Sequence, residues 1–144
     1  MHPFLVIADR AARAAGKIIM QSFDKRDRLK IYEKPSKEIV TEVDYSVDRL
    51  LIEQIQAAYP THSILTEESG LLQKDEDYLW VIDPLDGTNN FIHGLPGFAV
   101  SIALQKQGVL HQGLVYDPLA RETFYASRGQ VAQSNQKRLR VSQH

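Results

Sequence analysis

Two spacings of apolar residues, one typical of helices and one typical of strands, follow each other along the chain. Their order is the feature that most limits what the chain can fold into. Apolar side chains recur every three or four residues over 3–23 and over about 41–58, which predicts two amphipathic helices. Strand-like runs follow, at 63–66, 78–82, 98–105, 109–116 and 122–126, with a last short strand after Gly129. Helices followed by a meander predict an α+β fold, with two N-terminal helices packed on a largely antiparallel sheet.

Local signals sharpen several of these elements. Thr41 is a natural N-cap for the second helix, and Asp44 stands three residues later, as in a capping box. The continuous apolar run YLWVI (78–82) predicts a strand buried on both faces. The charged stretch 24–37 predicts a loop with one short strand at most.

Composition excludes several classes of protein. The 144 residues carry 17 Lys and Arg against 18 Asp and Glu, and a net charge of −1 argues against nucleic-acid binding through charge. The sequence has no cysteine, which excludes disulfide scaffolds, cysteine-ligated zinc and thiol nucleophiles. No apolar run approaches the ~18 residues of a membrane span, and the N-terminus does not resemble a signal peptide. We therefore expect a cytoplasmic protein.

Acidic residues gather where predicted elements begin or end. Glu67 and Glu68 follow one strand, Asp83 and Asp86 follow the next, and Asp44 opens the second helix. Such carboxylates, with no Lys or Arg interleaved, indicate an oxygen-ligand site for Mg²⁺ or Mn²⁺. The alternative is that each acid is an ordinary turn or capping residue at the surface.

The segment after Asp86 suggests a second partner for this site. Gly87, Thr88, Asn89 and Asn90 can start a short helix, whose free N–H groups attract phosphate. Metals held by carboxylates beside a bound phosphate make a phosphomonoesterase site. The alternative is that Asp-Gly forms a tight hairpin turn, but the next alternating run begins too far along the chain for a two-residue loop.

Longer motifs around these residues resemble a known family. IVTEVD (39–44), TEES (66–69) and WVIDPLDGTNNF (80–91) are similar to the inositol monophosphatase family of Mg²⁺-dependent, Li⁺-sensitive phosphatases, and most of all to its bacterial SuhB-type branch. The likeness continues in Tyr59-Pro60, FAVSIAL (98–104), GLVYDP (113–118) and RLRVS (138–142). It implies that residues 1–144 form an N-terminal metal- and phosphate-binding domain, part of the family's αβαβα sandwich.

The resemblance implies roles for the acids and a cofactor, Mg²⁺, which Mn²⁺ can replace. Glu67 matches the family's metal-binding glutamate, and Asp83 matches the aspartate that two metals share. The main-chain carbonyl of Leu85 matches a ligand of the first metal. Asp86 matches an aspartate that binds the second metal and that also touches the substrate.

The remaining matches concern the phosphate and the water. Gly87 and Thr88 match the phosphate-binding amides, and the Thr88 hydroxyl matches the one that orients the attacking water. Asp44 and Glu68 resemble outer acids that help to activate this water or hold a third, weaker metal. Lys34 matches a loop lysine near the site.

The main departure from the family is length. Family members are about twice as long, and their second half supplies a further metal-binding aspartate and most contacts to the sugar or inositol ring. That aspartate belongs to a WD-containing motif, and after Asp117 this sequence contains neither Asp nor Trp.

The implied reaction is hydrolysis of inositol monophosphate, or of a similar small sugar phosphate, by a metal-activated water. Relatives of the same fold act on fructose bisphosphate or 3′-phosphoadenosine nucleotides, and homodimers are common among full-length members. The alternative is a non-catalytic interaction protein or an inactive fragment. Some bacterial relatives associate with the transcription machinery, so RNA polymerase-associated factors are the partners that this alternative implies.

Overall fold

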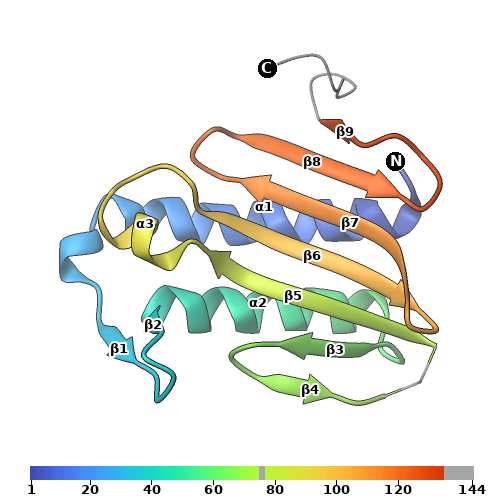
Figure 1. Cartoon of the computed structure of the whole chain (residues 1–144), viewed down its shortest axis with the longest axis horizontal. Helices are drawn as coiled ribbons and strands as arrows, with labels where there is room; N and C mark the ends of the chain where they lie inside the picture. Colours follow the sequence, from blue (N-terminus) through green and yellow to red (C-terminus); the bar gives the residue numbers. More distant parts are fainter. Residues whose placement is uncertain (75–76, 135–144) are drawn as a thin grey trace.

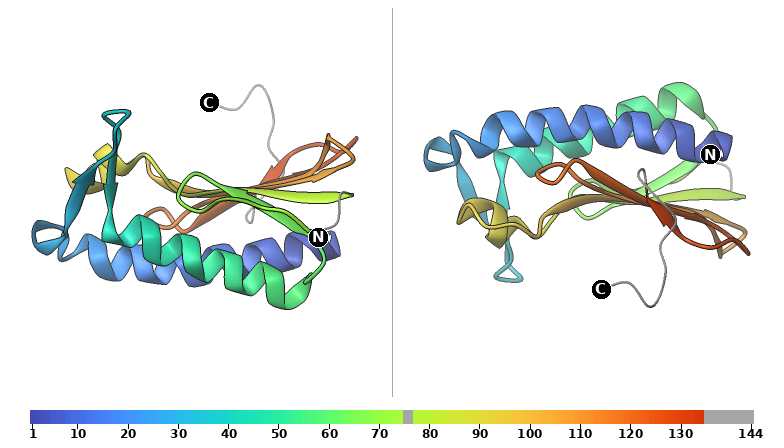
Figure 2. Two further views of the ribbon diagram at one scale, coloured as in Figure 1. Left: turned by 90° about the horizontal axis from the view of Figure 1, so that it is seen from below. Right: turned by 90° about the horizontal axis from the view of Figure 1, so that it is seen from above.

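The computed structural model describes residues 1–74 and 77–134, and these residues form a layer of helices against a sheet (Figure 1). The two long helices are α1 (Pro3–Phe23) and α2 (Glu42–Ala58), and Figure 2 shows both on the same side of the sheet. The predicted α+β arrangement is confirmed. The motif at 138–142 lies outside the described residues.

The main sheet has seven strands in the order β4-β3-β5-β6-β7-β8-β9. Their bounds are β3 (Ser63–Thr66), β4 (Gly70–Leu72), β5 (Tyr78–Asp86), β6 (Ala99–Lys106), β7 (Val109–Asp117), β8 (Glu122–Ser127) and β9 (Gln133–Ser134). Neighbours pair antiparallel except β3 and β5, which are parallel. The sheet is therefore largely antiparallel, as predicted, but β4 and the parallel pair were not foreseen.

The predicted loop at 24–37 contains one short strand, β1 (Ile31–Glu33), as expected, together with a short 3₁₀ turn, η1 (Arg26–Arg28). The pairing of β1 with β2 (Ile39–Thr41) into a hairpin was not predicted. This hairpin lies at one end of the sheet, beside the short helix α3 (Thr88–Ile92) (Figure 1). Both β3 and β5 run toward the same end.

The start of α2 follows the predicted capping box. The Thr41 side chain accepts hydrogen bonds from the backbone N–H groups of Val43 and Asp44, and the Asp44 carboxylate accepts one from the Thr41 N–H. These bonds satisfy donors that the first turn of a helix leaves free. They fix Asp44 at the end of α2 that faces α3 and β2.

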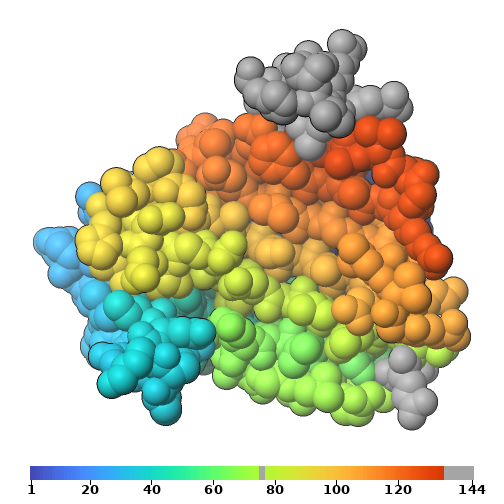
Figure 3. All heavy atoms as spheres, in the orientation of Figure 1, coloured from blue at the N-terminus to red at the C-terminus, as the bar shows by residue number. Residues whose placement is uncertain are grey.

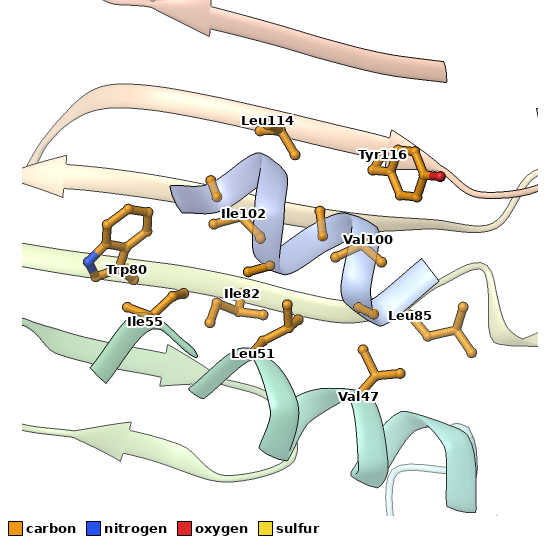
Figure 4. Packing of buried hydrophobic residues seen from close by; sticks show 14 of the residues in the cluster. Val47, Leu51, Ile55, Trp80, Ile82, Leu85, Val100, Ile102, Leu114 and Tyr116 are labelled. Atoms are coloured by element: carbon orange, nitrogen blue, oxygen red, sulfur yellow. The ribbon is translucent and has the colours of Figure 1, made fainter. Parts of the chain in front are cut away.

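The core lies between the helices and one face of the sheet. Figure 4 shows α2 side chains pointing at strand side chains, and the labelled members are Val47, Leu51, Ile55, Trp80, Ile82, Leu85, Val100, Ile102, Leu114 and Tyr116. On β5, Trp80 and Ile82 are buried, whereas Leu79 and Val81 on the opposite face are only half-buried. The prediction that this strand is buried on both faces is therefore wrong, because the helices cover one face only. No helix of the described residues is long and apolar enough to cross a membrane.

Gly16 marks the closest approach of α1 to the sheet. A Cβ at this position would lie 2.5 Å from a ring carbon of Tyr116 on β7 and 3.3 Å from Pro118. The missing side chain thus lets the helix pack directly against the Tyr116 ring.

We expect Gly16→Ala to lower the free energy of unfolding by about 1 kcal/mol. Alanine improves helix propensity by about 1 kcal/mol, but overpacking a tight contact costs about 1–3 kcal/mol. Gly113→Ala on β7 is the control, because an added Cβ there would meet no atom within 4 Å beyond its own residue and its two chain neighbours. Urea unfolding of both variants makes the comparison, and a stabilised Gly16→Ala protein would contradict the contact.

The face of the sheet away from the helices is apolar and open, and Figure 3 shows its strands at the surface. One row of paired residues crosses this open face through Leu71, Leu65, Val81, Ala103, Gly113 and Ala126. Leu65 and Val115 are 37% and 40% exposed. Apolar surfaces of this kind drive association in water.

We therefore predict that the 144-residue chain self-associates, and that Val115→Lys shifts it toward the monomer. Val6→Lys is the matched control, because Val6 on α1 has the same 40% exposure but lies on the helical side. Sedimentation velocity measures the distribution of species. A wild-type chain that sediments as a single monomer would contradict the prediction.

Candidate active site

A cavity of about 370 Å³ opens where β3 and β5 end. Every residue predicted for the site lines it, from the β1–β2 hairpin, α2, the turn after β3, the end of β5 and the start of α3: Lys34, Asp44, Glu67, Glu68, Asp83, Leu85, Asp86, Gly87 and Thr88. Glu38, Ile39, Asn89 and Asn90 complete the lining. Because the acids share one cavity, the alternative that each is an independent turn or capping residue at the surface does not account for their arrangement.

An irregularity in β5 explains how this strand supplies two acids to one cavity. Asp83 and Asp86 lie within β5 rather than after it, and the pairing with β6 shifts between them. In a regular strand, residues three apart point to opposite faces. Here Leu85 turns into the core and both carboxylates reach the cavity. Pro84, which has no N–H to donate, suits the break in pairing.

Gly87 makes the turn from β5 into α3. Its φ of 84° lies in the left-handed region, and a Cβ would lie only 2.2 Å from the carbonyl oxygen of Gly97. The Gly87 carbonyl accepts the N–H of Phe91, which starts the helix. The predicted short helix is confirmed, and the alternative of a tight hairpin at Asp86-Gly87 is wrong.

Asp83 shows the electrostatic character of the cavity most clearly. Burial, and after it the negative charges of Asp86 and Glu67, raise its pKa to about 6. A backbone hydrogen bond from Leu85 lowers it but does not offset the burial. The carboxylates of this cavity therefore repel one another, and a bound cation would relieve that repulsion.

Glu68 has a positive partner that the spacing of charges along the chain did not reveal. Its side chain is almost fully buried and accepts a hydrogen bond of 2.5 Å from the Lys34 ammonium. Burial still raises the pKa of Glu68, while the bond to Glu68 raises the pKa of Lys34. The ion pair ties the β1–β2 hairpin to the turn after β3.

Asp44 forms part of the cavity wall, and both of its carboxylate oxygens accept hydrogen bonds. One oxygen accepts from the N–H and the hydroxyl of Thr41, at 2.8 and 2.7 Å. The other lies 3.0 Å from the Thr88 hydroxyl, which is also 3.1 Å from the Leu85 carbonyl oxygen. Asp44 is therefore placed to orient Thr88, and it is only 3% exposed.

The donor set suits a hard divalent cation. Carboxylate and carbonyl oxygens are the ligands that Mg²⁺ prefers, and Mg²⁺ commonly takes one or two carboxylates together with waters. Within residues 1–74 and 77–134, no three His, Asp or Glu side chains form a ready-made metal cage. One or two acids with a main-chain carbonyl need no such cage, so the residues fit the ion.

Comparison with known proteins shows the family of this chain. The sequence model of the inositol monophosphatase family matches residues 1–144. The chain belongs to this family. The Nus factor SuhB of Pseudomonas aeruginosa is 50% identical over 145 residues, which cover 99% of this chain and 54% of that protein. The chain thus spans about half the length of the curated relatives that it matches.

Solved structures show the same fold. The extragenic suppressor protein SuhB of Bartonella henselae superposes with a TM-score of 0.93 at 34% identity, over 98% of this chain and 55% of that one. The inositol monophosphatase (IMPase) of Thermotoga maritima superposes with a TM-score of 0.85 at 37% identity, over 97% and 54%. These likenesses confirm the fold and the family that the motifs indicated.

The raised pKa of Asp83 predicts how stability depends on pH without added metal. The folded state binds the proton more tightly than the unfolded chain, where the usual value is 3.8. The contribution of Asp83 to the free energy of unfolding is therefore most favourable below pH 4 and is lost as the pH rises through about 6. Asp83→Asn should remove this loss, which is on the order of 1 kcal/mol because solvent screens the half-exposed group.

Thermal unfolding in a chelator, from pH 4 to pH 7.5, provides the measurement. The melting temperature of Asp83→Asn should exceed that of the wild type by a margin that grows with pH. Glu53→Gln, at an exposed position on α2, is the control. A margin that stays constant across this range would contradict the electrostatic account.

Proposed function

We propose that the chain forms the metal- and phosphate-binding half of a Mg²⁺-dependent phosphomonoesterase. The observation that carries this proposal is the single cavity that brings the acids after β3 and the acids of β5 beside the Asp86-Gly87-Thr88 turn. The substrate class is inositol monophosphate or a similar small sugar phosphate, supported by the family and by the IMPase neighbour. The predicted homodimer and the cytoplasmic location remain predictions.

In this proposal, the ligands of the ion come from the two strand ends. Glu67, Asp83, Asp86 and the carbonyl oxygen of Leu85 would hold Mg²⁺, which Mn²⁺ can replace. When bound, the ion would supply polarisation of the phosphoryl oxygens and of a water. Burial and the negative charges of Asp86 and Glu67 raise the pKa of Asp83, and this supports the assignment, since a cation would bind where negative charge is uncompensated.

The start of α3 would bind the phosphate and orient the attacking water. The backbone N–H groups of Gly87 and Thr88 would donate to phosphoryl oxygens, and the Thr88 hydroxyl would orient the water. The Asp44 carboxylate fixes that hydroxyl from behind. Glu68 is engaged by Lys34, so this acid would take part in activating the water only as a member of an ion pair.

The test is phosphate release from inositol 1-phosphate, with and without Mg²⁺. Because the chain spans about half of its relatives, it is assayed alone and joined to the second half of the Thermotoga maritima IMPase. We expect Mg²⁺-dependent release from the joined protein, and a loss of at least about 100-fold with Asp83→Asn or Asp86→Asn. Release that survives either substitution would contradict the proposal.

A second candidate function is a binding role in transcription. The observation in its favour is the 50% identity to proteins named Nus factor SuhB. The same Asp83→Asn variant separates the two candidates. Binding to RNA polymerase-associated factors would not depend on this carboxylate, whereas phosphate release would.

A further inference from the structure

Asp48 is a buried acid that lies outside the cavity and that neither proposed function uses. It lies on α2 and is only 3% exposed. One carboxylate oxygen accepts a hydrogen bond from the Ser69 hydroxyl. The other is buried and has no hydrogen-bond partner among the residues that the structure describes. A buried carboxylate that is only half satisfied costs stability, so its single bond calls for an explanation.

The position of Asp48 on α2 suggests an explanation for its single hydrogen bond. Asp44 and Asp48 stand four residues apart, and this spacing puts them on the same face of the helix. Asp44 accepts from Thr88, just after β5, and Asp48 accepts from Ser69, just after β3. The helix thus holds one hydroxyl from each of the two chain segments that carry the acids of the cavity.

The turn after β3 needs such an attachment. It carries Glu67 and Glu68, which line the same cavity as Asp83 on β5, and carboxylates gathered in one cavity repel one another. That repulsion pushes the turn away from β5. Ser69 opposes it at the far end of the turn, through the bond to Asp48 and through its N–H, which donates to the Thr66 hydroxyl at 2.8 Å.

We propose that Asp48 and Ser69 form a positioning pair that holds the Glu67–Glu68 turn against the charge repulsion of the cavity and so sets its affinity for a divalent cation. Neither residue lines the cavity, so neither acts as a ligand. This inference rests on the proposed metal site. Ligand groups must stay close to their binding geometry, so a turn released from α2 binds the ion more weakly.

The experiment uses Ser69→Ala and Asp48→Ala in the 144-residue chain, with Ser69→Thr as the conservative variant that keeps a hydroxyl. Ser46→Ala and Glu53→Gln are matched controls at exposed positions on α2. Two quantities are measured: amide hydrogen exchange at 67–69 without metal, and Mn²⁺ affinity by electron paramagnetic resonance. Melting temperatures show that each variant is folded.

We expect Ser69→Ala to speed exchange in the turn and to weaken Mn²⁺ binding, each by about 10-fold, the scale of losses seen when groups that orient metal ligands are removed. Ser69→Thr and the two controls should match the wild type. The double variant of Asp48 and Ser69 should bind Mn²⁺ no more weakly than the weaker single variant, because both changes break the same bond.

Two outcomes would overturn the inference: exchange in Ser69→Ala as slow as in Ser46→Ala, or faster exchange with unchanged Mn²⁺ affinity. Failure of the proposed metal site gives a different result, since Asp83→Asn would then bind Mn²⁺ as the wild type does. In that event the exchange measurement alone decides whether the pair holds the turn.

Discussion

The parallel pairing of β3 with β5 determines where the acidic residues meet. Parallel strands end at the same edge of a sheet, so Glu67 and Glu68 come to lie beside Asp83 and Asp86, although β4 and most of β5 lie between them in sequence. Helix α2 runs opposite to β3 and therefore begins at this edge, which brings Asp44 to the same place. Reversing the direction of one strand would separate the acids by the length of the sheet.

The cavity concentrates negative charge, and the surrounding structure opposes the resulting repulsion. The ammonium of Lys34 neutralises Glu68, and the bulge before Asp86 lets Leu85 anchor the strand end in the core. The capping box holds Asp44 rigidly at the start of α2. Packing and capping around the cavity thus compensate for the stability that charge repulsion costs there, as is common at functional sites.

The spacing of apolar residues along the sequence was enough to locate both helices and most strands, because each of these elements has its own local pattern of buried residues. It could not show which strands pair, and so β4 and the parallel β3–β5 pair were missed. The motif around Asp86 predicted, through family resemblance, residues that do line one cavity. The shift in β5 that aims Asp83 and Asp86 into that cavity could not be predicted, because it depends on pairing with β6. The spacing of Asp44 and Asp48 is visible in the sequence, but their partners Thr88 and Ser69 come from distant segments.

The open face of the sheet and the acidic cavity share a border. A shallow hollow on that face is lined by apolar Leu65 and Val81 and also by the acids Glu67 and Asp83. Any surface that covers the hollow removes water from these carboxylates and makes their charge harder to sustain without a cation. With a cation at the proposed site, covering the face and binding the cation would be thermodynamically linked, and by reciprocity the bound cation would strengthen the contact that covers the sheet.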